Sequence, residues 1–135
     1  MTDTTKSEYL QQSSQLDNHT RPQIAILDFG SQYSHLIARR VRELHVYCEL
    51  YSCLVTPEEL GNHELTAIIL SGGPNSVYEK DAPHVNEGVW KIIKERNIPV
   101  LGICYGMQVC LLCVRPIRPN CVFIIVDVCF VCCYV

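Results

Sequence analysis

The sequence is poor in the features that mark membrane and nucleic-acid proteins. Charged side chains make up only 19% of its 135 residues and the formal net charge is −3, so no basic excess is present that would bind nucleic acid or an anionic membrane surface. The most apolar stretch, residues 121–135, is shorter than the about 20 residues that span a bilayer, and Asp127 interrupts it. We therefore expect neither a nucleic-acid nor a membrane partner, and a cytoplasmic location.

The N-terminal segment, residues 1–22, also lacks an apolar run. A secretory signal peptide needs a basic start followed by a hydrophobic stretch, and this polar segment has neither. We interpret it as a disordered polar leader. Without an export signal, the nine cysteines are expected to stay reduced rather than to form a disulfide framework.

From position 23 onward, short β-prone apolar runs alternate with segments of helical periodicity. The runs predict strands at residues 24–27, 46–50, 66–70 and 100–103. Because the connections are short and mostly helical, the strands are expected to be parallel. The predicted fold is therefore α/β, a parallel sheet with helices on both faces, in which the carboxyl ends of the strands share one edge.

Capping residues mark where the helices start. Ser31, Thr56 and Asn86 are the expected N-caps of three helices, and Pro57 occupies the first position of the second. The predicted inward faces consist of Tyr33, Leu36, Ile37, Val41 and Leu44 in the first helix and of Val89, Trp90 and Ile93 in the third. On the solvent side of the first helix, Arg39 and Glu43 can pair across one turn.

The strand at residues 100–103 ends at Cys104, with Gly102 and Gly106 two positions to either side. A small residue on each side of a nucleophile, between a strand and a helix, is the thiol version of the nucleophile elbow. The unpaired amides and the dipole of the following helix would favour a thiolate there. The alternative is a buried core cysteine with glycines incidental to a turn, and the spacing after a strand favours the nucleophile.

A second glycine-rich turn, residues 71–76, follows the strand at 66–70. Such a turn can offer backbone N–H groups to an anion or to an oxyanion, or it can simply connect two elements. Because the predicted elbow lies on the same sheet edge, we expect the Gly73 amide to join the Tyr105 amide as a pair of oxyanion donors. The dinucleotide-binding glycine pattern is absent after the first strand, where Gly30 stands alone.

Four segments together resemble a known family: residues 27–33 (LDFGSQY), 37–43 (IARRVRE), 70–77 (LSGGPNSV) and 101–108 (LGICYGMQ). The last two are similar to class I glutamine amidotransferases in general. The first two resemble the amidotransferase domain of the GMP synthase family in particular. The resemblance runs from about residue 23 to residue 108 and implies a flavodoxin-like parallel sheet.

The resemblance also implies a set of site residues. Cys104 would attack the side-chain amide of glutamine, forming a thioester and releasing ammonia, while the amides of Gly73 and Tyr105 hold the oxyanion. Gln108 would help to bind glutamine, and Gly102 and Gly106 would be the elbow glycines. This part of the family needs no metal or cofactor. Its partner is a synthetase domain, in cis or in trans, which uses ATP and Mg²⁺ to convert xanthosine monophosphate to GMP.

The resemblance ends at Gln108. The family carries a catalytic histidine and glutamate beyond the elbow, but all five histidines here precede Cys104 and no glutamate follows Glu95. We divide the chain into the leader (1–22), a partial amidotransferase domain (23–108) and a non-family tail (109–135). We expect the chain alone to be a poor or inactive glutaminase. The alternatives are a non-catalytic module that binds glutamine or docks on a partner, and an unstable truncated product.

The tail contains a spacing typical of zinc ribbons, with Cys110 and Cys113 followed by Cys129 and Cys132. Two observations argue against a metal site. Cys110 and Cys113 fall where the helix after the elbow should continue, and neither pair has the glycine or polar turn residues that wrap a metal. We therefore predict no metal.

Overall fold

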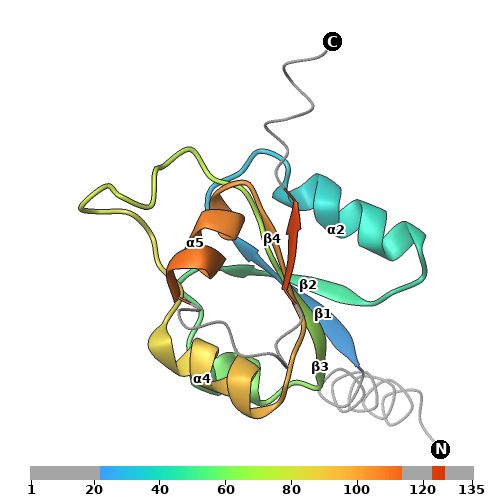
Figure 1. Ribbon diagram of the computed structural model, residues 1–135. Helices are drawn as coiled ribbons and strands as arrows, with labels where there is room; N and C mark the ends of the chain where they lie inside the picture. The colour runs from blue at the N-terminus through green and yellow to red at the C-terminus, as the bar shows by residue number, and fades with distance from the viewer. Residues whose placement is uncertain (1–21, 114–122, 127–135) are drawn as a thin grey trace, which may run out of the picture.

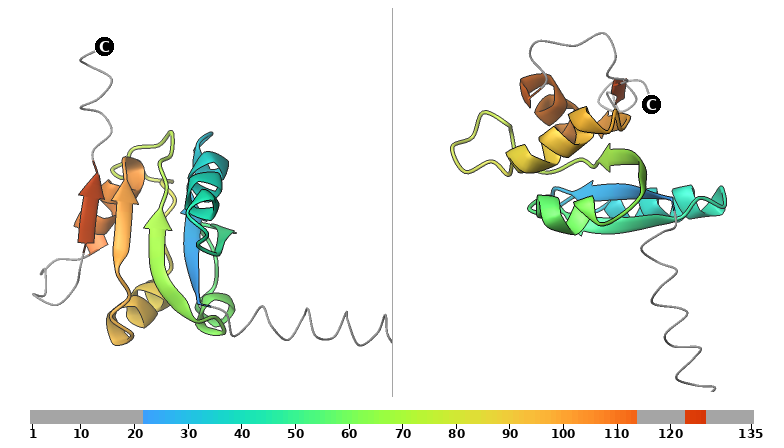
Figure 2. Two further views of the ribbon diagram at one scale, coloured as in Figure 1. Left: turned by 90° about the vertical axis from the view of Figure 1, so that its right-hand side faces the viewer. Right: turned by 90° about the horizontal axis from the view of Figure 1, so that it is seen from below.

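A five-stranded parallel sheet forms the centre of the molecule. The computed structural model describes residues 22–113 and 123–126. Its strands are β1 (Gln23–Asp28), β2 (Cys48–Ser52), β3 (Leu65–Leu70), β4 (Val100–Ile103) and β5 (Phe123–Val126). They lie in the order β2-β1-β3-β4-β5, with every neighbouring pair parallel (Figures 1 and 2). The α/β class is confirmed, and the strand order is that of flavodoxin-like folds.

Helices cover both faces of the sheet, as predicted. The described helices are α2 (Ser34–Glu43), α3 (Pro57–Gly61), α4 (Glu87–Glu95) and α5 (Tyr105–Cys113). Helix α2 packs on one face, whereas α4 and α5 lie on the opposite face (Figures 1 and 2). Leu60 of α3 belongs to the same core cluster as the buried residues of α4 and α5, so α3 shares their face.

The two faces carry separate halves of the core because side chains along a strand alternate between faces. Leu27 and Leu70 contribute to the half beneath α3, α4 and α5. Ile26 and Ile69, one position earlier in the same strands, contribute to the half beneath α2. Strands buried on both faces explain the continuous apolar runs in the sequence.

Two of the predicted helix starts are confirmed. The Thr56 hydroxyl accepts a hydrogen bond from the Glu59 amide at 3.3 Å, with Pro57 as the first residue of α3. The Asn86 side chain accepts from the Gly88 amide at 2.8 Å and caps α4, whose residues Val89, Trp90 and Ile93 are buried as expected.

The predicted start and inward face of the first helix are partly wrong. Helix α2 begins at Ser34 with Tyr33 as its N-cap, while Ser31 accepts from the Tyr33 amide in the turn before it. The predicted stripe holds at Ile37 and Val41, which pack against the core. Three other members, Tyr33, Leu36 and Leu44, are 58%, 44% and 76% exposed.

The reason is that the helix rests on small residues. Ser34 and Ala38 are the buried residues of α2, and the Cys48 thiol donates a hydrogen bond to the Ala38 carbonyl at 3.4 Å. A small side chain lets the helix backbone approach the sheet closely. The larger apolar residues of the helix then lie beside these small residues, at the edge of the contact with the sheet.

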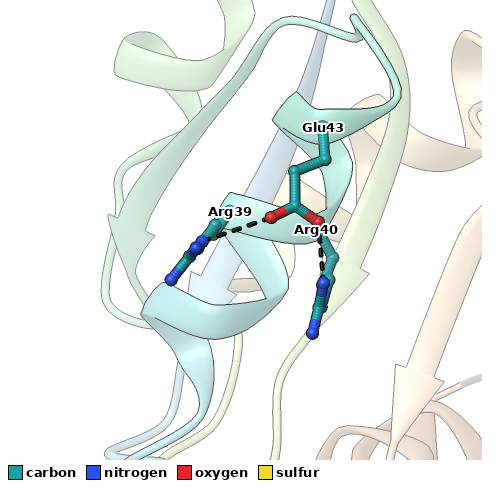
Figure 3. A network of polar contacts seen from close by, with 3 residues as sticks. All are labelled: Arg39, Arg40 and Glu43. Atoms are coloured by element: carbon teal, nitrogen blue, oxygen red, sulfur yellow. Dashed lines mark hydrogen bonds and ion pairs between the residues drawn. The ribbon is translucent and has the colours of Figure 1, made fainter.

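The opposite side of α2 is a solvated charged face. Glu43 forms ion pairs with Arg39 at 3.2 Å and Arg40 at 2.8 Å, both within the helix (Figure 3). The arginine side chains are 76% and 71% exposed. Exposed pairs of this kind stabilise a helix only slightly.

The chain between α2 and β2 also departs from prediction, since β2 starts at Cys48 and not at residue 46. His45 has a φ of 60° and its amide bonds back to the Arg42 carbonyl, so the chain is still leaving the helix at this point. Val46, 38% exposed, belongs to that connection.

Parts of the predicted tail take part in this fold. Helix α5 continues through Gln108 to Cys113, and residues 123–126 pair with β4 as β5. The predicted leader, apart from Pro22, lies outside the described residues. Among the described helices, none has the length and apolar character needed to cross a membrane.

Two leucine truncations test this division between core and surface. We expect Leu60→Ala to lower the free energy of unfolding by about 2–5 kcal/mol, because Leu60 is fully buried in the core. Leu44→Ala, which removes the same atoms from a side chain 76% exposed, should change it by less than about 0.5 kcal/mol. Urea denaturation measures both. A loss for Leu44→Ala as large as that for Leu60→Ala would show that Leu44 is buried, as the sequence predicts for the inward face of α2.

Candidate active site

Cys104 lies at the junction between β4 and α5, at the carboxyl edge of the sheet. Its φ is +54°, in the left-handed region that residues with a side chain rarely adopt. The residue is partly exposed, so it is neither sealed in the core nor fully in solvent. A strained, accessible residue between a strand and a helix has the geometry of a nucleophile elbow.

The flanking glycines are required by close backbone contacts. A Cβ atom on Gly102 would lie 2.7 Å from the Cα of Met107, on the first turn of α5. A Cβ on Gly106 would overlap the carbonyl oxygen of Leu70, at the end of β3. Any side chain at either position would push the elbow away from the neighbouring backbone.

The glycine-rich turn after β3 lies beside the elbow. The Gly106 amide donates to the Ser71 carbonyl at 3.1 Å, which joins the two segments directly. A Cβ on Gly72 would stand 3.6 Å from the Cβ of Cys104, and one on Gly73 would stand 2.7 Å from the Phe29 carbonyl oxygen. The structure therefore brings together the ends of β1, β3 and β4, as the shared-edge argument predicts.

Two backbone donors near the elbow are left unused. Within the described part of the chain, neither the Gly73 amide nor the Tyr105 amide has a hydrogen-bond acceptor. Tyr105 is the first residue of α5, where the helix dipole places partial positive charge. Unpaired N–H groups beside a nucleophile can stabilise negative charge that develops on a substrate oxygen.

The side chain of Tyr105 anchors the elbow in the core. It is 2% exposed, its ring centroid lies 5.2 Å from that of Phe29, and its hydroxyl donates to the Pro83 carbonyl at 2.7 Å. Gln108, one turn further along α5, is half-buried, and its backbone amide donates to the Cys104 carbonyl at 3.3 Å.

A partly buried hydrogen-bond network next to the elbow was not found by sequence reasoning. The Ser34 hydroxyl donates to the Asp28 carboxylate at 2.7 Å and lies 3.1 Å from the Ser71 hydroxyl. The amides of Gly30 and Ser31 donate to the same carboxylate oxygen. The only sequence signal is an aspartate and two serines at the ends of predicted elements, in segments distant from one another.

This network sets the ionisation of Asp28. Burial by itself would raise the pKa of this carboxyl, but hydrogen bonds from the Ser34 hydroxyl and from the Gly30 and Ser31 amides outweigh burial, so the pKa is lowered. The carboxylate is therefore ionised at neutral pH and acts only as an acceptor.

Of the four cysteines with zinc-ribbon spacing, the structure describes two, Cys110 and Cys113. Cys110 is buried in the core on α5, and burial raises its pKa to about 12, so its thiol stays protonated at neutral pH. Cys129 and Cys132 lie outside the described residues. No group of three or more histidine, cysteine, aspartate or glutamate residues that could hold a metal ion occurs within residues 22–113 and 123–126.

Comparison with known proteins assigns the family. The family model for class-I glutamine amidotransferases matches residues 25–115. The chain belongs to this family. A glutamine-hydrolysing GMP synthase of Nostoc punctiforme is 57% identical over 88 residues, which cover 65% of this chain and 16% of that protein. The corresponding enzyme of Schizosaccharomyces pombe is 59% identical over 85 residues, or 63% of this chain and 15% of the enzyme.

A solved structure supports the same assignment. A crystal structure described as that of a GMP synthase subunit from Thermoplasma acidophilum matches with a TM-score of 0.53 and 36% identity, over 67% of this chain and 43% of that one. The resemblance to the amidotransferase domain of GMP synthases is thereby confirmed. The matched part of the chain spans only about one sixth of the length of these curated relatives, 15–16%.

The backbone strain at Cys104 can be measured by exchanging its side chain. Glycine adopts a φ of +54° without cost, whereas alanine retains the strain. We therefore expect Cys104→Gly to be more stable than Cys104→Ala by about 1 kcal/mol. Urea denaturation of the two variants gives the difference. If Cys104→Ala were the more stable, the elbow would not be strained in solution.

The lowered pKa of Asp28 predicts a pH-dependent contribution to stability. A carboxyl whose pKa is lower in the folded state stabilises the fold above its unfolded pKa, near 3.8, and loses this contribution as the pH falls below that value. The loss of stability caused by Asp28→Asn should therefore be larger at pH 6 than at pH 3, in urea denaturation at both pH values. Asp81→Asn, at an exposed loop position, is the control. Equal losses for Asp28→Asn at the two pH values would contradict the proposed ionisation.

Proposed function

We propose that this chain carries the glutamine-cleaving site of a GMP synthase, with Cys104 as the nucleophile. The observation that supports this most directly is the geometry of Cys104: a partly exposed cysteine held at a φ of +54° beside unpaired backbone donors. Neither a core cysteine nor an ordinary turn requires such a conformation. Membership of the class I glutamine amidotransferase family supports the same chemistry.

In the proposed reaction, the Cys104 sulfur attacks the carbon of the glutamine side-chain amide. Its electron pair forms the C–S bond while the carbonyl electrons move onto oxygen, and the Gly73 and Tyr105 amides donate hydrogen bonds to that oxyanion. Collapse of the intermediate expels the amide nitrogen, which takes up a proton and leaves as ammonia. Water then hydrolyses the thioester to glutamate. Gln108, on the next turn of α5, is proposed to contact the bound glutamine.

Proton transfer is the part of this reaction that the 135 residues do not supply. None of the five histidines follows Cys104, and His84, in the loop between β3 and α4, is exposed. The amide nitrogen is a poor leaving group unless it is protonated, so removing the base and its partner from a nucleophile costs several orders of magnitude in rate. We therefore propose that a polypeptide of these residues forms acyl-enzyme from activated substrates but does not turn glutamine over.

The ammonia would be consumed by a synthetase partner, in cis or in trans. The curated relatives are much longer than this chain and are named glutamine-hydrolysing GMP synthases. We propose that the amination of xanthosine monophosphate, with ATP and Mg²⁺, belongs to that partner.

An activated substrate separates acylation from proton transfer. We expect the chain, at pH 8, to release one equivalent of 4-nitrophenolate from glutamic acid γ-(4-nitrophenyl) ester and to gain a γ-glutamyl group on Cys104. This leaving group departs without protonation, so the missing base is not needed. Absorbance gives the burst, and peptide mass spectrometry locates the label. Glutamine itself should yield no ammonia above the blank.

Two variants control this experiment. Cys104→Ala should abolish both burst and label, whereas Cys53→Ala should retain them, because Cys53 is buried in the core and burial raises its pKa. A label distributed over several cysteines, or a burst that persists in Cys104→Ala, would show that Cys104 is not the nucleophile.

A further inference from the structure

We propose that Ser71 is a positioning residue for the oxyanion site: its hydroxyl, beside Ser34 and Asp28, fixes the plane of the Gly72–Gly73 peptide and with it the direction of the Gly73 amide. This inference rests on the proposed function, because the oxyanion site belongs to the proposed reaction. The residues given a role here would touch neither the substrate nor the sulfur. It is carried by the arrangement of hydrogen bonds around the Ser71 hydroxyl.

The first step concerns a single peptide group. The Ser71 hydroxyl donates to the carbonyl oxygen of Gly72 at 3.0 Å. That carbonyl and the amide of Gly73 belong to the same planar peptide, and in a trans peptide the C=O and N–H bonds point in opposite directions. Holding the Gly72 oxygen on the Ser71 side therefore directs the Gly73 N–H to the other side, away from the serine.

The second step is that the Ser71 hydroxyl has no freedom to turn away. It is fully buried and accepts a hydrogen bond from the Phe29 amide at 3.2 Å. It also lies 3.1 Å from the Ser34 hydroxyl, whose single proton goes to the closer, ionised Asp28 carboxylate at 2.7 Å. A serine hydroxyl has one proton, and for Ser71 its acceptor is the Gly72 carbonyl oxygen at 3.0 Å.

The third step connects this hydroxyl to a fixed charge. Ser34 is fully buried and lies 2.7 Å from the Asp28 carboxylate, which also receives the Gly30 and Ser31 amides. Hydrogen bonds to an ionised group are stronger than neutral ones, and buried networks reinforce their members. The carboxylate at the end of β1 thus holds Ser34 in place, with its hydroxyl oxygen beside that of Ser71.

The glycine turn needs such an external support. Two adjacent glycines have little conformational preference of their own. A side chain at Gly73 would restrict the turn, but the Phe29 carbonyl leaves no room for one. Ser71 also accepts the Gly106 amide on its own carbonyl, so a single residue relates the glycine turn to the elbow helix that carries the second donor, Tyr105.

The acylation assay described above tests this role when it is run on variants of the network. We expect Ser71→Ala to slow the release of 4-nitrophenolate by about tenfold or more, because losing one oxyanion donor costs up to about 10²–10³ in rate. Ser34→Ala, which leaves the Ser71 hydroxyl in place, should give a smaller loss. The rate of alkylation of Cys104 by iodoacetamide, a displacement without an oxyanion, should stay within about twofold in both variants.

A matched control and a second readout make the outcome decisive. Ser76→Ala removes a hydroxyl from the same loop, one that accepts only the Tyr78 amide among the described residues, and should leave both rates unchanged. In ¹⁵N spectra of the chain, Ser71→Ala should shift the Gly73 amide resonance, and Ser76→Ala should not. Near-UV circular dichroism of Trp90 reports whether each variant is folded.

The results separate the two proposals. If the unmodified chain is acylated at Cys104 and Ser71→Ala has no effect on the acylation rate, the positioning role is wrong and the proposed nucleophile stands. If the unmodified chain is not acylated but the Gly73 resonance moves in Ser71→Ala, the proposed function is wrong. The effect of the Ser71 hydroxyl on the Gly72–Gly73 peptide is then still supported. An unmoved Gly73 resonance in a folded Ser71→Ala variant overturns the inference outright.

Discussion

The contact on which the rest of the site depends is the approach of two backbones, where the start of α5 meets the end of β3. Gly106 lies so close to the Leu70 carbonyl that no side chain fits between them, and its amide bonds to the carbonyl of Ser71. This contact fixes where the helix begins relative to the neighbouring strand. Because the elbow residue immediately precedes that helix, it also fixes Cys104 beside the glycine turn.

This arrangement strains the backbone of Cys104, and the packing of the core beneath it keeps the strained conformation in place. A left-handed backbone at a residue with a side chain costs of order 1 kcal/mol and persists only where surrounding contacts impose it. Here the turn follows β4, which pairs with a strand on each side, and α5 leaves the turn with Tyr105 and Val109 buried in the core. The strand and the helix are each held in place, so the residue between them has no relaxed alternative.

The sequence predicted the elements that depend on local chemistry. Apolar runs located β1, β3 and β4, and the caps at Thr56 and Asn86 located α3 and α4. It failed where the outcome depends on what an element packs against. The inward face of α2 is set by Ala38, whose small size permits close approach but gives no hydropathy signal. The contact of Ser34 with Ser71 joins residues 37 positions apart, and no local pattern encodes it.

The same distinction applies to the proposed chemistry. The groups that would stabilise an oxyanion come from the ends of adjacent strands, β1, β3 and β4, and from the turns directly after them, so a short stretch of chain can assemble them. A general base does not have to come from an adjacent strand end. It can lie on any element of the fold from which its side chain reaches the nucleophile. The proposed oxyanion donors and a proton-transferring base can therefore come from different parts of a protein. The oxyanion half is the one that the geometry around Cys104 supports.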